Sequence, residues 1–378
     1  MKNGWRSKQL GDLCDVLDHK RKPITKRDRE AGEYPYYGAT GVLDYVAGYL
    51  FDEPLVLVGE DGAKWASGEN TAFAVEGKIW VNNHAHVLRP HRSKLLDNWL
   101  IYHLNHSDLT EFVSGLTVPK LNQGSLREIP VPLPPLPEQQ RIVGILDEAF
   151  DGIATAKANA EKNLQNARAL FESHLQSVFT QRGAGWEVKK IGEIAKHSLG
   201  KMLDKAKNKG KPQPYLRNIN VRWFTFDLSD LLQMRFLPGE TEKCTALRGD
   251  VLICEGGYPG RAAIWDEDYP IYFQKALHRV RFHELEQNKW FVYYLYAQDK
   301  SGELRQHFSG TGIQHFTGEV LARFELPLPP MPELRRAVSK FEELSTETQR
   351  LASLYEQKLA ALEALKKSLL HQAFSGEL

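Results

Sequence analysis

The sequence predicts a mixed α/β (α+β) fold: two similar globular domains separated by two long helices that form an antiparallel coiled coil, with pseudo-two-fold symmetry. Two observations predict it. The segment Pro-Leu-Pro-Pro-Leu-Pro-Glu at 132–138 returns as Pro-Leu-Pro-Pro-Met-Pro-Glu at 327–333. Each copy opens a long, uninterrupted helical pattern. The 378 residues are therefore built twice, each time as a globular region followed by a long helix.

The first globular domain is predicted over residues 1–137. Residues 55–58 are apolar and short enough for a buried strand, and residues 78–82 alternate as a strand does. Residues 98–104 are typical of a short, aromatic-rich helix. Strands and helices mixed in this way indicate a domain of the mixed α/β class.

The second globular domain is predicted over residues 181–332 with the same order of elements. Its strands are expected at 251–253 and 278–282, and its short helix at 288–296. The offset between the copies grows from 181 residues at the first Gly-Trp pair to 195 at the proline motif. Loops accept insertions easily, so we expect the extra residues of the second copy to lie in loops.

The two long helices are predicted over residues 138–180 and 333–378, each about 40 residues and roughly 60 Å long. In each, small or apolar residues recur at steps of three and four. The first stripe is Ile142, Leu146, Ala149, Ile153, Ala156, Ala160, Leu164, Ala167, Leu170, His174 and Val178. The second is Phe341, Leu344, Thr348, Leu351, Tyr355, Leu359, Leu362, Leu365, Leu369 and Ala373. Stripes this long favour pairing with each other over the alternative, in which each helix lies on its own domain.

Composition excludes several classes of protein. No stretch approaches the ~20 apolar residues that span a bilayer, so we expect no membrane contact. Three cysteines without a CxxC pair indicate a reducing compartment, and a cytoplasmic location is expected. His84 and His86 lie two apart without an evident third ligand, so no metal site is expected. Phosphate loops, dinucleotide fingerprints and hydrolase motifs are missing, and no catalytic residues are predicted.

Net charge is only +1, but cations gather at matching places in both halves. In the first half the candidates for phosphate contact are Lys20, Arg21, Lys22, Lys26 and Arg27. In the second they are Lys201, Lys205, Lys207 and Lys209. Glycine and proline nearby suggest loops, and basic loops can neutralise DNA phosphates. A solvated surface loop is the alternative, and the duplication favours the functional interpretation.

Candidates for reading base edges come from polar segments, because Asn, Gln and Arg pair with purine edges in the major groove. They are Asn82, Asn83 and His84 in the first half, and Arg217, Asn218, Asn220, Tyr258, Arg261, Gln274, Lys275, Gln314 and His315 in the second. Ser114, Thr117 and Lys120 precede the first proline motif. A Ser-Gly segment occurs there in both halves, either to donate N–H groups to phosphate or to form a turn.

With these motifs in order, the chain resembles a specificity subunit of a type I restriction–modification system. The resemblance covers essentially the whole chain. It rests on the two proline motifs, the first followed by Gln-Gln-Arg141 and the second by Leu-Arg-Arg336, and on the ending His371-Gln-Ala-Phe-Ser-Gly-Glu-Leu. It also rests on residues 81–87 and 274–280. Leu334 replaces Gln139 in the second copy, so contacts at that position need not be symmetric.

The resemblance implies that residues 1–137 and 181–332 are target-recognition domains, each reading one half of a split site in double-stranded DNA. It implies two modification subunits, which bind S-adenosylmethionine and methylate adenine, and ATP-driven restriction subunits. S-adenosylmethionine, ATP and Mg²⁺ would then belong to the partners, with no cofactor in this chain. The alternatives are a non-catalytic coiled-coil scaffold and a fused DNA methyltransferase or nuclease.

Overall fold

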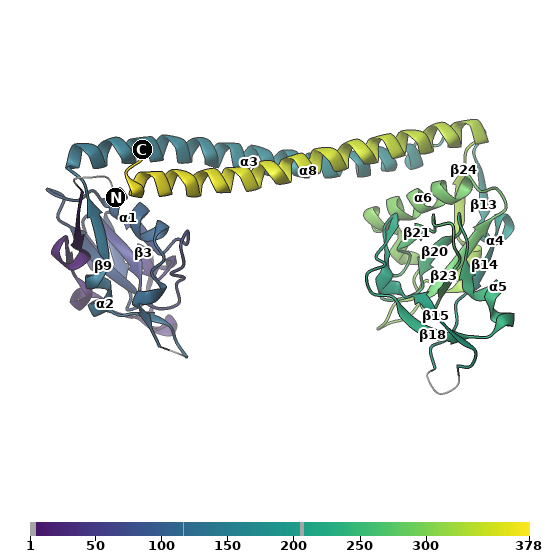
Figure 1. The fold of residues 1–378 in the computed structure, drawn as a ribbon, viewed down its shortest axis with the longest axis horizontal. Coiled ribbons are helices and arrows are strands. Elements are labelled where there is room, and N and C mark those ends of the chain that lie inside the picture. Colours follow the sequence, from purple (N-terminus) through teal and green to yellow (C-terminus); the bar gives the residue numbers. More distant parts are fainter. Residues whose placement is uncertain (1–4, 116, 205–207) are drawn as a thin grey trace. The chain divides into compact units, whose positions relative to one another are not determined.

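The computed structural model describes residues 5–115, 117–204 and 208–378, and it divides into two compact units (Figure 1). Unit 1 comprises Met1–Glu161 and Glu356–Leu378, and unit 2 comprises Lys162–Tyr355. Each unit therefore contains one globular part and a portion of both long helices. These helices are α3, Leu136–Thr180, and α8, Met331–Ser375, and each begins two residues before the position expected from the proline motif.

Unit 1 contains two four-stranded sheets. The first has the antiparallel order β2-β9-β6-β7, with β2 at Cys14–Val16, β9 at Ala85–Pro90, β6 at Leu55–Gly59 and β7 at Ala72–Val75. The second has the order β4-β3-β8-β5, with β4 at Gly41–Val46, β3 at Ala31–Gly38, β8 at Lys78–Val81 and β5 at Phe51–Asp52. Only β3 and β8 run parallel in this sheet, with Tyr36 opposite Trp80.

Unit 2 repeats this topology strand for strand. Its first sheet is β14-β23-β20-β21, with β14 at Ala195–Leu199, β23 at Leu277–Phe282, β20 at Val251–Cys254 and β21 at Ala262–Ile264. Its second is β18-β15-β22-β19, with β18 at Leu232–Phe236, β15 at Lys211–Leu216, β22 at Ile271–Phe273 and β19 at Thr245–Ala246. The parallel pair recurs as β15 and β22. The expected mixed α/β class and domain duplication are confirmed.

Short elements complete each globular part. The helices are α1 (Asp97–His106), α2 (Gln123–Glu128), α4 (Ile191–Ile194), α5 (Thr241–Cys244), α6 (Gln287–Ser301) and α7 (Gly318–Arg323). The remaining strands are β1 (Arg6–Gln9), β10 (Val113–Ser114), β11 (Lys120–Leu121), β12 (Pro130–Leu133), β13 (Glu187–Lys190), β16 (Val221–Arg222), β17 (Thr225–Phe226) and β24 (Glu325–Leu328). The predicted short helices correspond to α1 and α6.

The proline motif is held beside the start of each domain. Strand β1 pairs with β12, and β13 pairs with β24 in the same antiparallel way. The indole N–H of Trp99 donates to the Pro132 carbonyl at 2.8 Å, and that of Trp290 donates to Pro327 at 2.7 Å. Pro132 and Pro327 have no N–H to donate, but their carbonyls accept these matched bonds, which tie the chain to α1 and α6 just before each long helix begins.

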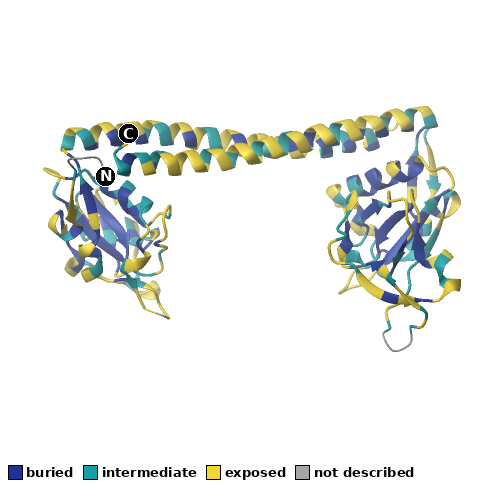
Figure 2. Cartoon of the chain, in the orientation of Figure 1, coloured by how far each residue is buried: buried dark blue, intermediate teal, exposed yellow. Residues whose placement is uncertain are grey.

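The long helices pair antiparallel, and each end also packs on a globular part (Figure 2). In unit 1, Leu146 near the start of α3 shares a buried core with Leu370 near the end of α8. In unit 2, Leu175 near the end of α3 shares a core with Leu334 near the start of α8. The expected antiparallel pair is therefore confirmed, and each stripe serves a domain as well as the partner helix.

The expected stripes are wrong at two positions. Leu170 and Leu365 are about half exposed, although both were predicted to face inward. In α3 the buried face passes through Phe171 instead, whose ring contacts Tyr293 and Tyr296 of α6. The large aromatic ring fills the space beside α6, so the buried face shifts by one residue from the pattern extrapolated along the helix.

Candidate nucleic-acid interface

Nine predicted site residues of unit 1 converge on one group of loops. These loops are the 3-10 turn Asp18–Lys20 with the segment after it, the end of β6, the turn between β8 and β9, and the β10–β11 hairpin. Backbone bonds tie them together: the Glu60 N–H donates to the His84 carbonyl at 2.9 Å, and the Leu121 N–H donates to the Glu60 carbonyl at 2.8 Å. The residues brought together are Lys20, Arg21, Lys22, Asn82, Asn83, His84, Ser114, Thr117 and Lys120.

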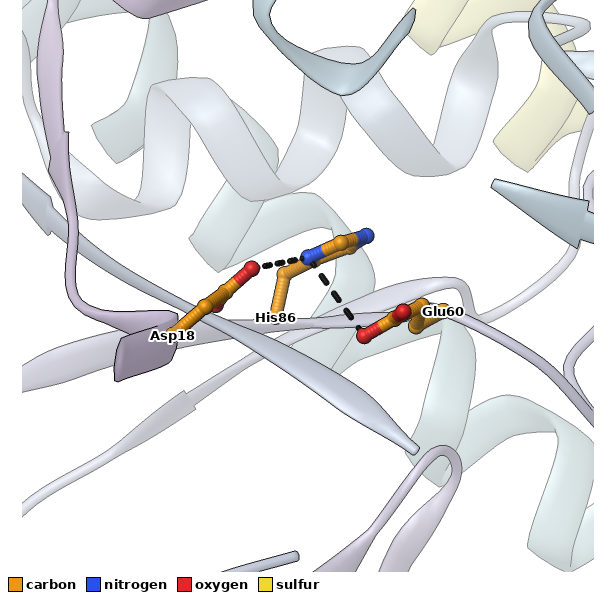
Figure 3. Close-up of side chains that lie close together, drawn as sticks. All are labelled: Asp18, Glu60 and His86. Carbon is orange, nitrogen blue, oxygen red and sulfur yellow. Dashed lines mark hydrogen bonds and ion pairs between the residues drawn. The ribbon is translucent and has the colours of Figure 1, made fainter. Parts of the chain in front are cut away.

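A buried polar network lies at the centre of these loops (Figure 3). His86 is fully buried, and its Nδ1 lies 2.6 Å from Asp18 Oδ2 and 3.8 Å from Glu60 Oε2. Arg21 pairs with Glu60 and donates to the Ala85 carbonyl at 2.7 Å. Lys120 Nζ lies 2.8 Å from Glu60 Oε1. The network joins four segments that are far apart in the sequence.

Both carboxylates of this network are held ionised. Burial acts to raise the pKa of Asp18, but the hydrogen bond from His86 and the nearby Arg21 outweigh burial and leave the pKa below its usual value. Burial likewise opposes ionisation of Glu60, and hydrogen bonds from Lys120 and Arg21 lower its pKa. A carboxylate paired in this way stabilises the fold at neutral pH and loses that contribution when acid protonates it.

Sequence reasoning found no third metal ligand beside the histidine pair, and the structure places two acids at His86. Asp18, Glu60 and His86 offer ligand atoms within 4.8 Å of one another. Arg21 and Lys120 both pair with Glu60, so cations of the protein already balance its charge. His84 pairs instead with Asp61. The arrangement suits a structural clamp for the loops better than an ion site.

The predicted residues of unit 1 differ in what they offer a ligand. Asn82 is buried, and its Oδ1 accepts from the His84 N–H at 2.8 Å, so it shapes the turn. The Arg21 side chain is only 13% exposed and engaged internally. The exposed candidates are Lys20, Lys22, Lys26, Arg27, Asn83, Ser114 and Thr117, together with the half-buried Lys120 and the half-exposed His84.

Unit 2 builds the same loop group with the same backbone bonds. The Glu255 N–H donates to the Ala276 carbonyl at 2.9 Å, and the Phe316 N–H donates to the Glu255 carbonyl at 2.8 Å. A bridge between Ser309 and His315 replaces the β10–β11 hairpin. The predicted residues of this half that gather here are Lys201, Arg217, Asn218, Asn220, Tyr258, Arg261, Gln274, Lys275, Gln314 and His315.

Arg261 is the most distinctive side chain of this second group. Its guanidinium donates to the Asn218 carbonyl at 2.9 Å and lies 4.9 Å from the centre of the Tyr258 ring. Among the described residues, its Nε and the Nδ1 of His315 are buried without a hydrogen-bond partner. Tyr258, Lys275 and Gln314 are exposed beside them. The group thus combines a stacked guanidinium with unused polar atoms, which suits recognition of a planar polar ligand.

Three predicted residues of unit 2 are held inside the fold. Lys201 pairs with Glu240 and donates to the Arg235 carbonyl at 2.9 Å. Asn220 is buried and bonds to the Arg217 N–H and to two backbone carbonyls. Arg217 is itself paired with Asp230 at 2.6 Å. Lys205 and Lys207 lie outside the described residues, whereas Lys209 is exposed.

Sequence reasoning missed the residues that build the loop group. His86 and His278 are both buried, and each Nε2 bonds to a backbone carbonyl after the Ser-Gly segment, of Leu121 at 2.7 Å and Phe316 at 3.0 Å. Glu60 and Glu255 supply the backbone contacts above. A signal was available, since Glu60 and Glu255 stand 195 residues apart, as do the Ser-Gly segments.

Comparison with known proteins places this repeated architecture in a family. The model of the type I restriction modification DNA specificity domain matches residues 2–165 and again residues 184–363. The chain therefore belongs to the family of type I restriction–modification specificity subunits and contains two specificity domains.

Two of its relatives cover nearly the full chain. It is 27% identical over 371 residues to a putative type I restriction enzyme specificity subunit of Haemophilus influenzae, covering 96% of this chain and 94% of the relative. It is 20% identical over 399 residues to the MjaVIII specificity subunit of Methanocaldococcus jannaschii, covering 99% and 93%.

Solved structures show the same fold. The HsdS subunit from Thermoanaerobacter tengcongensis aligns with a TM-score of 0.63 at 18% identity, covering 100% of this chain and 98% of that one. A chain from a structure describing assembly and conformational transition of the type I system aligns with a TM-score of 0.73 at 18% identity, covering 100% and 99%. No helix in the described part of this chain has both the length and the apolar character to cross a membrane.

Proposed function

We propose that this chain is the non-catalytic DNA-reading subunit of a type I restriction–modification complex, with each specificity domain reading one half of a bipartite site. One observation carries the proposal: the same loop group, closed by the same backbone bonds around Glu60 and Glu255, occurs once in each unit. The scaffold is repeated while the side chains on it differ. That combination suits two related readers of two different base sequences.

Two kinds of contact follow from the exposure of the loop residues. The exposed cations near the first group, Lys20, Lys22, Lys26 and Arg27, suit phosphate contacts that position the domain. Asn83 in unit 1 and Arg261 and Gln314 in unit 2 carry the amide and guanidinium groups that pair with base edges. Arg21 and Lys201 are assigned to loop structure, because their charges are already paired.

We assign spacing and assembly to the long helices. Each has 45 residues and runs from one unit into the other, so the pair connects the two reading domains directly. Two modification subunits, which use S-adenosylmethionine, and ATP- and Mg²⁺-dependent restriction subunits would dock on this chain. The chemistry would then belong to these partners and the choice of sequence to this chain.

A domain exchange tests the proposal. Residues 1–137 are replaced by those of a relative, the variant is expressed with its modification subunits, and methylated adenines are mapped across a genome. We expect one half of the methylated sequence to change and the other half and the spacer to stay. The matched control replaces residues 181–332 and should change only the other half. A change in both halves, or in neither, would contradict the two-reader proposal.

The non-catalytic assignment has its own test. The purified chain is incubated with DNA and radiolabelled S-adenosylmethionine, first alone and then with the modification subunits. Methyl transfer is expected only in the second mixture. Transfer by the chain alone would favour the fused-methyltransferase alternative.

A further inference from the structure

Two exposed apolar side chains occupy the same place in both halves. Val118 is 64% exposed and Ile313 is 75% exposed, the highest values among the exposed large hydrophobic residues of the described chain. They stand 195 residues apart, at the offset of the proline motif. Each lies in the loop that follows the Ser-Gly segment. A single exposed apolar residue is ordinary, but the same exposure at the same position of two diverged domains calls for a shared cause.

Leu116 lies outside the described residues, but the two loops share the pairing at their base and the conformation of their glycine. Ser114 pairs with Lys120 across the first loop, and Ser309 pairs with His315 across the second. Gly115 has φ +99° and Gly310 has φ +102°. A Cβ at these glycines would lie 2.4 Å from the Val118 carbonyl oxygen and 2.3 Å from that of Ile313. Only glycine fits at this position, so the two loops turn in the same way after the serine.

The base of each loop is anchored in the buried core. The Leu121 carbonyl accepts from the ring of His86, and the Leu121 N–H donates to Glu60. In unit 2 the Phe316 carbonyl and N–H make the matching bonds to His278 and Glu255. These bonds hold each tip against the polar residues beside it, so the apolar side chain is presented on a supported hairpin.

The residues next to Val118 and Ile313 suit contact with duplex DNA, which is a polyanion with an apolar base stack inside. Residues 113–121 and 308–316 contain no Asp or Glu. Thr117 and Lys120 flank Val118, and Gln314 and His315 follow Ile313. These neighbours are among the proposed DNA contacts, so Val118 and Ile313 are expected to meet the same DNA. Between the phosphates, duplex DNA offers apolar contact only at base steps and thymine methyl groups.

We propose that Val118 and Ile313 are apolar wedges that enter a groove of the DNA and contact the bases, one in each half-site. The inference rests on the proposed function and adds two recognition residues to it. Each wedge gains from leaving water only when it reaches the base stack. Val118 acts on the half-site of the first domain, and Ile313 acts on that of the second.

The test uses the full chain assembled with its modification subunits and a duplex carrying the site found by methylation mapping. 2-Aminopurine is placed at successive positions to report base unstacking. Val118→Ser and Ile313→Ser should each lower DNA affinity about tenfold, the loss of one apolar contact, and abolish the fluorescence rise in one half-site only. The dependence of affinity on salt should stay unchanged, since no charge is removed.

Controls separate the possible failures. Leu285→Ser, at a position 62% exposed outside both loop groups and outside the long helices, should leave affinity and fluorescence unchanged. Val118→Ile and Ile313→Val keep an apolar tip and should bind as the wild type does. Serine variants that bind and unstack like the wild type would overturn the wedge proposal alone. Serine variants that keep DNA affinity but no longer co-purify with the modification subunits would reassign the tips to protein contacts. A wild-type complex without DNA affinity would instead overturn the proposed function.

Discussion

At the scale of single residues, Gln139 and Leu334 occupy the same position of the repeat but are buried in different surroundings. The Gln139 amide is fully buried and satisfied: it accepts from the Leu96 N–H at 2.9 Å and donates to the carbonyls of Lys94 at 2.8 Å and Pro134 at 2.9 Å. Leu334 is equally buried in an apolar core. The sequence predicted that contacts here need not match, and the structure shows a buried, hydrogen-bonded amide at this position in unit 1 only.

Replacing Gln139 tests how much these hydrogen bonds stabilise unit 1. Gln139→Leu leaves one N–H and two carbonyls without partners, and we expect unit 1 to lose about 2–4 kcal/mol of stability. Amide hydrogen exchange at Leu96 measures the loss locally. The matched control Leu334→Met keeps an apolar side chain of similar volume and should cost less than about 1.5 kcal/mol in unit 2. Unchanged exchange at Leu96 in the Gln139 variant would show that the bonds contribute nothing net.

His278 predicts a pH dependence of stability in unit 2. Its Nδ1 has no hydrogen-bond partner among the described residues, whereas His86 places Nδ1 against Asp18. Burial lowers the pKa of His278 to about 4, and the neighbouring His197 acts in the same direction. In the unfolded chain a histidine titrates near 6.5. The neutral ring thus contributes full stability above about pH 6.5 and progressively less as the pH falls toward 4.

The expected loss of unit 2 stability from His278 is about 3 kcal/mol between pH 7 and pH 4. His278→Gln keeps an amide donor for the Phe316 carbonyl but does not titrate, so urea unfolding of unit 2 should become less pH-dependent by that amount. His103 of unit 1 serves as the control, because burial also lowers its pKa to about 4 and the substitution does not touch it. An identical pH dependence in the variant and the wild type would refute the assignment.

At the scale of elements, the long helices depend on aromatic packing at their ends. Phe341 of α8 is fully buried, with its ring centre 5.9 Å from Trp290, 5.9 Å from Phe179 and 5.1 Å from Tyr293. One side chain thus joins α8 to both α3 and α6. The helical periodicity predicted that Phe341 faces inward but did not show that it meets a globular domain.

Truncation of Phe341 should therefore be costly. We expect Phe341→Ala to destabilise unit 2 by about 3–5 kcal/mol, because it leaves a cavity among three aromatic rings. Leu365→Ala in the same helix should cost less than about 0.5 kcal/mol, since Leu365 is about half exposed. Thermal and denaturant unfolding of the full chain measure both. A comparable loss in the two variants would mean that Leu365 is packed as tightly as Phe341, contrary to its exposure.

At the scale of the whole molecule, the exposed basic loop predicts how DNA affinity depends on salt. Replacing Lys20, Lys22 and Lys26 by alanine removes three exposed cations of unit 1. If each contacts a phosphate, the slope of log affinity against log salt should fall by about 2.7, at about 0.9 per contact. Fluorescence anisotropy of the assembled complex on a labelled duplex measures it. The matched control replaces Lys162, Lys340 and Lys358, which are exposed on the long helices, and should leave the slope unchanged. Equal slopes in wild type and loop variant would remove these residues from the interface.

The candidate site could be predicted from the sequence only in part. Residues such as Asn83, Arg261 and Gln314 stood out because their side chains suit base edges, and the structure gathers them on matching loops. Asn82, Asn220 and Lys201 have the same chemistry but are held inside the fold. Residue type indicates what a side chain can bind, whereas its exposure depends on neighbours such as Glu240 that lie far away in the sequence.

The sequence by itself determined the duplication, the mixed α/β class and the two long helices, because repeated motifs and helical periodicity are local properties of the chain. Only the tertiary structure decided the strand order with its parallel pair β3–β8, the shift of the buried face to Phe171, and the clamp of Asp18, Glu60 and His86. Those features join residues tens of positions apart. Their energies come from packing and desolvation that exist only once the chain has folded.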